Sequence, residues 1–360
     1  MLRNKQKKKI LFYCPFINKG GIETNLLKYT NFLTDYYSVY IYTNSFSNRI
    51  LSKINKKVKV MNIKNKFYLR NRILNDFMVY KSLKKNLDQK SIIFSLQDHF
   101  FILILNFLFS KSKIIIRTSS MIPNQNNYDE QKHLKNLVIK KIFLGLYRLA
   151  DEVITFSKNN VEAFSKRNIK SVCIYNYFKK KEIINPKINQ KFNIFYIGRF
   201  TFDKDPKFFL NNLLKFKNIN IHLVGDGIEK KDLKKIANKQ KNIFFHNFIN
   251  NPFKKFKHKI HLLCITSLYD GTPNVMGEAM SFGIPVLAPK NVGSTNFYLK
   301  NGKLGYLYKN ENSNSFKKKI SEILSDYKRA KKKAIKGYHS MSRFNKEKTL
   351  FKLLGVIKKL

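Results

Sequence analysis

Short runs of apolar residues recur along this chain, and they alternate with stretches whose apolar residues are spaced as on one face of a helix. A continuous apolar run of this length is typical of a strand in a parallel sheet, because both faces of such a sheet are covered. The runs lie at residues 10–14, 39–42, 58–61, 92–96, 113–116, 153–156, 192–197, 219–224, 242–245, 261–265 and 285–288. Strands that alternate with helices predict an α/β fold with doubly wound parallel sheets.

The chain is long enough for two such domains. It has 360 residues, and a single domain usually holds roughly 100–200. The helical spacing is lost between residues 175 and 191, where lysine, asparagine and Pro186 accumulate. We therefore predict an N-terminal domain over residues 1–175, a linker over residues 176–191 and a C-terminal domain over residues 192–343.

The formal net charge of +49 suits nucleic acid, an anionic membrane or a phosphorylated substrate as partner. Lysine is spread through nearly every segment, so the charge indicates a general composition rather than a groove for nucleic acid. No nucleic-acid-binding module is recognisable. We expect no nucleic-acid partner, and a basic nucleic-acid-binding protein is the weaker alternative.

Cysteine and histidine usage favours a reducing compartment without a metal site. Cys14, Cys173 and Cys264 lie far apart and form no CxxC pair, which is typical of cytoplasmic proteins. The histidines show no metal-ligand spacing on one helix face. The most apolar stretch, residues 100–109, has about half of the roughly 20 residues that a membrane-spanning helix needs. We expect a cytoplasmic protein without a transmembrane segment.

Residues 267–289 are the most informative stretch for function. An apolar run ends before Asp270, Pro273 opens a helical stretch that contains Glu278, and Gly283 closes it. The first turn of a helix has free N–H groups and a favourable dipole, so it can bind phosphate. A carboxylate further along the helix, Glu278, can accept hydrogen bonds from ribose hydroxyls.

Two further loops carry residues suited to a diphosphate. Gly20 and Gly21 follow the first apolar run, where glycine lets N–H groups approach a phosphate, although an ordinary turn explains them equally well. Arg199 and Lys204 flank the loop after residues 192–197. Two cations can hold a diphosphate and stabilise its charge as it leaves, although in so basic a chain either can be a solvated surface charge. Residues 225–227 suit either a phosphate loop or a tight turn.

A long amphipathic helix is predicted over residues 132–149. Its apolar face suits the domain core, and docking on an anionic bilayer surface is the alternative.

These segments together resemble the retaining, nucleotide-sugar-dependent glycosyltransferases of family 4. The resemblance is carried by Gly20-Gly21-Ile22-Glu23, by Ile197-Gly198-Arg199-Phe200 with Lys204-Asp205, by residues 223–227 and by the stretch from Asp270 through Glu278 to Val286. It implies the GT-B fold, in which two Rossmann-like domains face each other across a cleft. It also implies that the final helix, residues 344–360, packs back on the N-terminal domain.

The resemblance assigns roles to residues. Arg199 and Lys204 would hold the donor diphosphate and stabilise it as it leaves, and Asp270 would position the transferred sugar. Glu278 would bind the ribose, and Gly20 and Gly21 would approach from the other domain. The main chain would contact the sugar, phosphate and base at Pro273, Asn274, Val275, Met276 and Phe248. No metal or other cofactor is implied.

Three positions depart from the family pattern. Asp270 stands where glutamate is usual, which shortens its reach by one methylene. Asn247 stands where glycine is common. The loop before His99 lacks the usual histidine register, so no catalytic histidine is assigned. His99 and Arg117 are kept as acceptor-side candidates.

The expected reaction moves a sugar, with retention of configuration, from a nucleoside diphosphate to a hydroxyl group. UDP is the expected nucleotide, and a glycan or lipid-linked glycan of cell-surface polysaccharide or lipopolysaccharide is the expected acceptor. The alternative within this fold is a nucleotide-sugar epimerase. The predicted location is the cytoplasm. A further expectation is that the protein lies at the inner face of the cytoplasmic membrane, in peripheral contact with anionic lipid.

Overall fold

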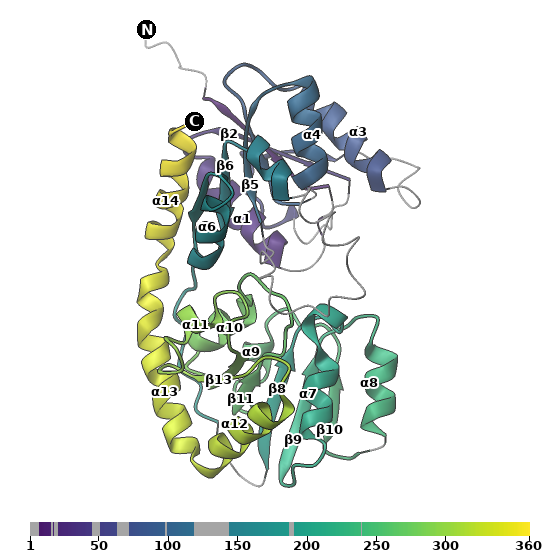
Figure 1. Ribbon diagram of the computed structural model, residues 1–360, viewed down its shortest axis with the longest axis vertical. Coiled ribbons are helices and arrows are strands. Elements are labelled where there is room, and N and C mark those ends of the chain that lie inside the picture. The colour runs from purple at the N-terminus through teal and green to yellow at the C-terminus, as the bar shows by residue number, and fades with distance from the viewer. Residues whose placement is uncertain are drawn as a thin grey trace. The chain divides into compact units, whose positions relative to one another are not determined.

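The computed structural model (Figure 1) describes residues 7–15, 17, 21–44, 51–62, 72–97, 99–118, 144–186, 191–238 and 240–360. The chain divides into two compact units, which are described separately. Unit 1 comprises residues 1–175 and 347–360, and unit 2 comprises residues 176–346.

Unit 1 is built on a parallel sheet. Its described strands follow the order β3-β2-β1-β4-β5-β6-β7. They are β1 (Lys9–Tyr13), β2 (Ser38–Thr43), β3 (Lys59–Asn62), β4 (Ile92–Ser95), β5 (Lys113–Arg117), β6 (Glu152–Thr155) and β7 (Ser171–Cys173). The chain order reverses at β1, which pairs with β2 on one side and with β4 on the other.

Helices cover this sheet. They are α1 (Gly21–Leu33), α3 (Arg72–Lys84), α4 (His99–Phe109), the 3-10 helix η2 (Tyr147–Leu149), α6 (Lys158–Ser165) and α14 (Lys346–Lys358), which belongs to unit 1 from Glu347 on. The inner strands β1, β4, β5 and β6 are buried on both faces, as their continuous apolar runs predict. Leu11, Ile93 and Ile114 are fully buried in one cluster with Val79 of α3 and Ile102 of α4.

Unit 2 holds a second parallel sheet in the order β10-β9-β8-β11-β12-β13. Its strands are β8 (Phe192–Ile197), β9 (Ile219–Val224), β10 (Ile243–His246), β11 (Leu262–Cys264), β12 (Val286–Pro289) and β13 (Tyr306–Tyr308). The order reverses at β8, the first strand of the unit, which pairs with β9 and with β11. Both described sheets are parallel and doubly wound, so the predicted α/β fold class is confirmed.

The helices of unit 2 have their starting points set in part by capping side chains. They are η3 (Phe202–Lys204), α7 (Pro206–Leu213), α8 (Lys230–Ala237), α9 (Pro252–Lys255), α10 (Asn274–Ser281), α11 (Thr295–Tyr298), α12 (Ser313–Ser325), α13 (Tyr327–Ser340) and η4 (Met341–Phe344). The side chains of Asp205, Asn251, Asn312 and Asp326 accept hydrogen bonds from the free N–H groups of α7, α9, α12 and α13. Figure 1 shows α7 and α8 beside each other, and the two helices are in contact.

Two expectations about helices need comment. The helical pattern of residues 315–333 predicts one helix, whereas the structure has two, because Asp326 ends α12 and caps α13. The helix predicted over residues 132–149 lies mostly outside the described residues, and its described end changes from α-helix at residues 144–146 to η2. Among the described residues, no helix is both long and apolar enough to cross a bilayer.

Candidate active site

The candidate site lies at the carboxyl ends of the unit 2 strands. In an open parallel sheet, ligands bind beyond these ends at the point where the strand order reverses. That point lies beside β8, between the loops that follow β8 and β11. The first loop carries Arg199 and Lys204, and the second carries Asp270.

A chain of ion pairs joins these two loops. Lys204 Nζ lies 2.5 Å from Asp270 Oδ2 and 3.7 Å from Asp203 Oδ2. Arg199 Nη2 lies 3.1 Å from the same oxygen of Asp203, and Thr201 Oγ1 donates to the other Asp203 oxygen at 2.6 Å. The structure therefore brings Asp270 to Lys204, 66 positions earlier in the sequence, and Asp203 links Arg199 to the same group.

The exposure of these side chains differs. The Arg199 side chain is 64% exposed, whereas those of Lys204 and Asp270 are 21% and 16% exposed. Arg199 can therefore turn toward a ligand without losing packing. Lys204 and Asp270 are held in a partly enclosed place, where an ion pair is screened less by water.

Hydrogen bonds to α7 and to the loop after β11 hold the loop after β8 in place. Asp205 has a backbone φ of 44° and caps α7 by accepting a hydrogen bond from Phe208 N at 3.0 Å. Burial raises the pKa of its carboxyl group. Thr266 Oγ1 donates to the carbonyl oxygens of Lys204 and Asp205 at 3.0 and 2.8 Å. Because Thr266 follows β11, this hydroxyl also ties the two loops together.

Two glycines make close backbone contacts with the loops that follow β8 and β11. A Cβ atom on Gly225, which has a φ of 149°, would lie 1.9 Å from the carbonyl oxygen of Gly198. A Cβ atom on Gly293, with a φ of 56°, would lie 2.3 Å from the carbonyl oxygen of Asp270. Both positions therefore require glycine. The segment 225–227 packs against the loop after β8, and Asp226 Oδ1 accepts from Gly227 N at 2.9 Å.

Helix α10 begins directly after the Asp270 loop. Pro273 is its N-cap residue, and Asn274 accepts a 2.6 Å hydrogen bond at its Oδ1 from Asn176 Nδ2. Val275 is half-buried and Met276 is buried. Glu278 is exposed on the first part of the helix. The first turn of α10 thus follows Asp270 closely in the sequence, and within this turn Met276 N donates to the carbonyl oxygen of Pro273 at 3.0 Å.

The other end of α10 is anchored by packing. The Lys331 ammonium group donates to the carbonyl oxygen of Gly283 at 2.8 Å and to that of Ile184, and burial lowers the Lys331 pKa to about 8. A Cβ atom on Gly277 would lie 2.4 Å from the Phe178 ring. Helix α10 is thus held rigidly, which keeps its N-terminus in place.

The segment after β10 supplies the predicted base-contacting residue. Phe248 is 49% exposed, and the preceding Asn247 accepts a hydrogen bond from Lys230 Nζ at 2.8 Å. The same ammonium group lies 3.3 Å from Asp226 Oδ1. Lys230 therefore links the loops after β9 and β10.

A histidine network under this segment was not predicted. The His222 ring stacks on Phe195 at 4.3 Å and on Phe244 at 4.9 Å between ring centroids. Its Nδ1 lies 3.1 Å from His246 Nε2, and its Nε2 lies 3.2 Å from Asn193 Oδ1. Burial, with the nearby His246, lowers the His222 pKa to about 3. Its place within the buried apolar run of β9 was the sequence signal for a packed histidine.

The remaining predicted residues belong to unit 1. Gly21 is the first residue of α1, and Gly20 lies outside the described residues. His99 begins α4, its Nδ1 lies 2.9 Å from Ser95 Oγ, and burial lowers its pKa to about 3. Arg117 is 2% exposed, with its guanidinium 4.6 Å from the Tyr29 ring and 4.2 Å from the Phe156 ring. The acceptor-side roles of His99 and Arg117 stay predictions, while the observed contacts are those of packed side chains.

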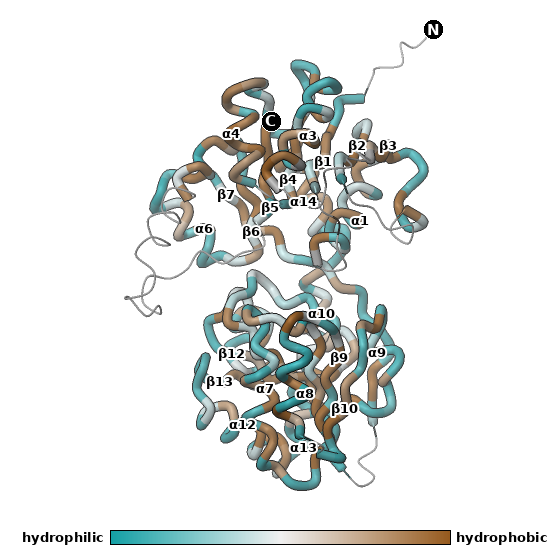
Figure 2. Tube along the Cα trace, turned by 90° about the vertical axis from the view of Figure 1, so that its right-hand side faces the viewer, coloured by the Kyte–Doolittle hydropathy of each residue, from teal (hydrophilic) through white to brown (hydrophobic). Residues whose placement is uncertain are grey.

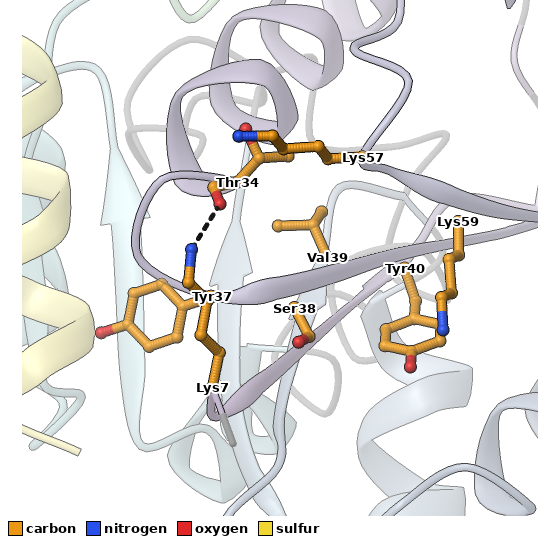
Figure 3. A pocket seen from close by; sticks show the side chains of 8 residues that line it. All are labelled: Lys7, Thr34, Tyr37, Ser38, Val39, Tyr40, Lys57 and Lys59. Carbon is orange, nitrogen blue, oxygen red and sulfur yellow. Dashed lines mark hydrogen bonds between the residues drawn. The ribbon is translucent and has the colours of Figure 1, made fainter. Parts of the chain in front are cut away.

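Unit 1 has a pocket of about 190 Å³ at the amino ends of its strands, the opposite end from the carboxyl ends where ligands of parallel sheets bind (Figure 3). It is lined near the amino ends of β2 and β3 by Lys7, Thr34, Tyr37, Ser38, Val39, Tyr40, Lys57 and Lys59. Lys7 Nζ donates there to the carbonyl oxygens of Thr34 and Asp35. Because ligands of parallel sheets bind at the carboxyl ends, this pocket is not the candidate site. Within the described part of the chain, no cluster of three or more His, Cys, Asp and Glu side chains is placed to hold a metal ion.

Comparison with known proteins gives a family match for unit 2. Residues 178–340 match the family described as Glycosyl transferases group 1. An uncharacterized glycosyltransferase of Methanocaldococcus jannaschii is 28% identical over 211 residues, 52% of this chain and 51% of that protein. The chain thus spans about half the length of this relative.

A second relative and a solved structure are similar over more of the chain. An N-acetylgalactosamine-N,N'-diacetylbacillosaminyl-diphospho-undecaprenol 4-alpha-N-acetylgalactosaminyltransferase of Campylobacter jejuni is 24% identical over 266 residues, 69% of this chain and 71% of that protein. The crystal structure of Anabaena HepE in complex with UDP has a TM-score of 0.76 and 17% identity, covering 98% of this chain and 100% of that chain. The structural likeness confirms the GT-B fold class, and the matches together indicate a transferase enzyme.

Proposed function

Because residues 178–340 match the family described as Glycosyl transferases group 1, we propose that this chain is a retaining glycosyltransferase of family 4. It transfers a sugar from a nucleoside diphosphate, UDP, to a hydroxyl group of a glycan or lipid-linked glycan. The observation that carries the proposal is the ion pair of Lys204 with Asp270, which joins the loops after β8 and β11 where the strand order reverses.

This ion-pair chain is suited to a donor diphosphate. The carboxylates of Asp203 and Asp270 neutralise Arg199 and Lys204. A diphosphate offers the same cations more negative charge and more acceptor oxygens, so it can replace the carboxylates. Asp270 then loses its bond to Lys204 and becomes available to the sugar.

The neighbouring elements complete the donor site. The N–H groups of Asn274 and Val275 in the first turn of α10 bind phosphate oxygens, and the main chain at Pro273 and Met276 contacts the sugar or phosphate. Glu278 accepts hydrogen bonds from the ribose hydroxyls, and the main chain at Phe248 binds the base. The HepE structure with UDP supports the choice of nucleotide. Contacts of Gly20 and Gly21 with the donor remain part of this proposal.

The proposed reaction breaks the bond between the anomeric carbon and the diphosphate oxygen. The acceptor oxygen forms its bond to the anomeric carbon on the same face, so the configuration is retained. The acceptor proton passes to the departing phosphate oxygen, and no separate base is required. Arg199 and Lys204 stabilise the charge that builds on the diphosphate, while Asp270 orients the sugar. No metal or other cofactor takes part in this proposal.

The acceptor is proposed to be a lipid-linked or growing glycan, used in making surface polysaccharide or lipopolysaccharide. The Campylobacter relative is named for an alpha linkage made on a diphospho-undecaprenol-linked sugar. An alpha product is what retention gives from an alpha-linked donor. We place this activity in the cytoplasm, at the inner face of the membrane.

A donor screen tests the proposal. The melting temperature of the protein is measured with UDP, GDP, ADP and their sugars, because a bound ligand raises it. The stabilising donor is then incubated with and without a glycan acceptor. Transfer only in the presence of acceptor supports a glycosyltransferase, whereas a changed nucleotide sugar or a free sugar product without acceptor indicates an epimerase instead.

A further inference from the structure

Helix α4 of unit 1 has an apolar outer face. Ile104, Phe107, Leu108 and Phe109 are 40%, 55%, 59% and 51% exposed. Asn106 is buried instead, where its Nδ2 donates to the carbonyl oxygen of Ser112 at 2.8 Å and its Oδ1 accepts from Ser110 Oγ at 2.7 Å. An ordinary surface helix shows the reverse arrangement, with polar side chains outside.

The neighbouring helix α3 extends this apolar surface. The two helices pack through Tyr80, whose hydroxyl donates to the carbonyl oxygen of Leu105 at 2.9 Å. On α3, Ile73 is 67% exposed and Phe77 is 40% exposed. Because residues four apart lie on the same side of a helix, these two side chains share one face. The tube of α4 is largely brown in Figure 2, which marks its hydrophobic sequence.

In the part of α3 and α4 that the structure describes, and directly after each helix, the exposed charges are positive. Lys81, Lys84 and Lys85 are exposed in and after the last turn of α3. Lys111 is exposed just after α4. The ammonium group of Lys84 lies 5.3 Å from the ring centroid of Phe109, so cation and apolar surface are adjacent. The two helices contain a single carboxylate, Asp76, and it is only 4% exposed.

We propose that this surface, the α3–α4 face, binds an anionic phospholipid bilayer. The face is defined by Ile73, Phe77, Ile104, Phe107, Leu108 and Phe109, with Lys81, Lys84, Lys85 and Lys111 beside them. Apolar side chains enter the boundary between headgroups and acyl chains, while lysine stems follow them and place their ammonium groups at the lipid phosphates. Each lysine near an anionic bilayer also gains from the negative surface potential.

The length of α4 fits a helix that lies on the bilayer. Its 11 residues extend about 16 Å, half of the roughly 30 Å of hydrocarbon that a spanning helix must cross. The proposal goes beyond the transfer reaction and is independent of the donor site in unit 2. It would bring the protein to the phase in which a lipid-linked acceptor resides.

A single-tryptophan reporter tests where the protein meets lipid. The chain contains no tryptophan, so Leu108→Trp introduces a unique fluorophore on the face. The matched control is Ile228→Trp in unit 2, where Ile228 is 86% exposed. With vesicles of three parts phosphatidylcholine to one part phosphatidylglycerol, we expect a blue shift and quenching by brominated acyl chains for Leu108→Trp alone. Absence of both effects at Leu108→Trp, or equal effects at the two sites, would overturn the proposal.

Charge reversal tests whether vesicle binding depends on the α3–α4 face or only on the overall charge of +49. Lys81, Lys84 and Lys85 are changed together to Glu, and Lys231, Lys234 and Lys235, which are exposed on α8, are changed likewise as the control. Vesicle sedimentation should show about a hundredfold weaker binding for the first triple variant and little change for the second. Equal losses would assign binding to net charge and contradict the proposal.

Replacing exposed apolar side chains by serine tests whether the α3–α4 face binds lipid or an acidic protein. Phe107→Ser with Leu108→Ser should lower vesicle binding at least about tenfold, whereas Phe202→Ser with Ile228→Ser in unit 2 should leave it unchanged. Undiminished binding of the first pair would overturn insertion into lipid and would favour a purely charged partner. Thermal unfolding without lipid verifies that each variant is folded, and failure here leaves the donor-site proposal untouched.

Discussion

Lys204 Nζ lies 2.5 Å from Asp270 Oδ2, across the two loops that meet where the unit 2 strand order reverses. The pair joins residues 66 positions apart in the sequence. The lysine is therefore held by the carboxylate that we expect to face the sugar. Under the proposed function, a donor diphosphate that takes Lys204 would release Asp270 in the same step.

Asp270→Asn should separate binding from transfer. Without its negative charge, residue 270 no longer competes for Lys204, so we expect UDP to bind as tightly as before or more tightly. Transfer should fall by about a hundredfold or more, because the carboxylate no longer orients the sugar. UDP titration and a transfer assay measure the two effects. Loss of UDP affinity together with unchanged transfer per bound donor would refute the role of Asp270.

Glu278→Ala should weaken UDP binding about tenfold, the effect of losing a charge-assisted hydrogen bond to ribose. Since Glu278 is exposed, the melting temperature without ligand should not change. Glu162→Ala, at an exposed position on α6 of unit 1, is the matched control. Equal UDP affinity in the two variants would exclude Glu278 from the donor site.

Gly225→Ala should destabilise unit 2 by about 3 kcal/mol, because the new Cβ atom collides with the Gly198 carbonyl oxygen in addition to the strain of a positive φ. Gly302→Ala isolates the strain alone. Gly302 has a φ of 88°, and the nearest atom to its Cβ position is 4.0 Å away, so we expect a loss of about 1 kcal/mol. Urea unfolding measures both changes, and similar losses would show that the close approach of the two loops is wrong.

Acidification should destabilise unit 2 through His222. Burial lowers the pKa of this histidine to about 3 in the folded protein, whereas the unfolded chain binds a proton near pH 6.5. The unfolded state therefore holds more protons between these values, and stability falls as the pH falls. The loss from this group is about 2 kcal/mol between pH 6.5 and pH 5.

The His222→Phe variant tests this assignment. Phenylalanine can keep the stack on Phe195 and Phe244 but cannot bind a proton. Its stability at pH 7 should be lower, because the contacts with His246 and Asn193 are lost. Its dependence on pH between 7 and 5, followed by urea unfolding, should be shallower than that of the unchanged protein. An equal slope would mean that His222 does not titrate as described.

The strands could be predicted from the sequence because each buried parallel strand is a continuous apolar run. Strands β7 and β13 are absent from the predicted runs, since each has three residues at an edge of its sheet. Strand β11 is as short but lies within the longer apolar run of residues 261–265. Asp326 was missed as a helix boundary for a different reason. An aspartate within an amphipathic pattern looks like any exposed position until its carboxylate is seen to cap α13.

The candidate site could be predicted only in part. Arg199, Lys204 and Asp270 were identified by their positions after apolar runs, but the sequence does not show that Lys204 contacts Asp270, because that depends on tertiary packing. Asp203 was missed, although its position four residues after Arg199 was a readable signal. The exposed face of α4 could not be predicted, because a helix that is apolar all round has no periodicity to show which side faces solvent.

The most direct test of the central claim is a calorimetric titration of UDP into three proteins: the unchanged chain, the pair Arg199→Ala with Lys204→Ala, and the control pair Lys231→Ala with Lys234→Ala on α8. We predict that the first pair binds UDP at least about a hundredfold more weakly, and that the control binds it as the unchanged chain does. If the Arg199 and Lys204 pair binds UDP as tightly as the unchanged chain, the donor diphosphate is not held at this site.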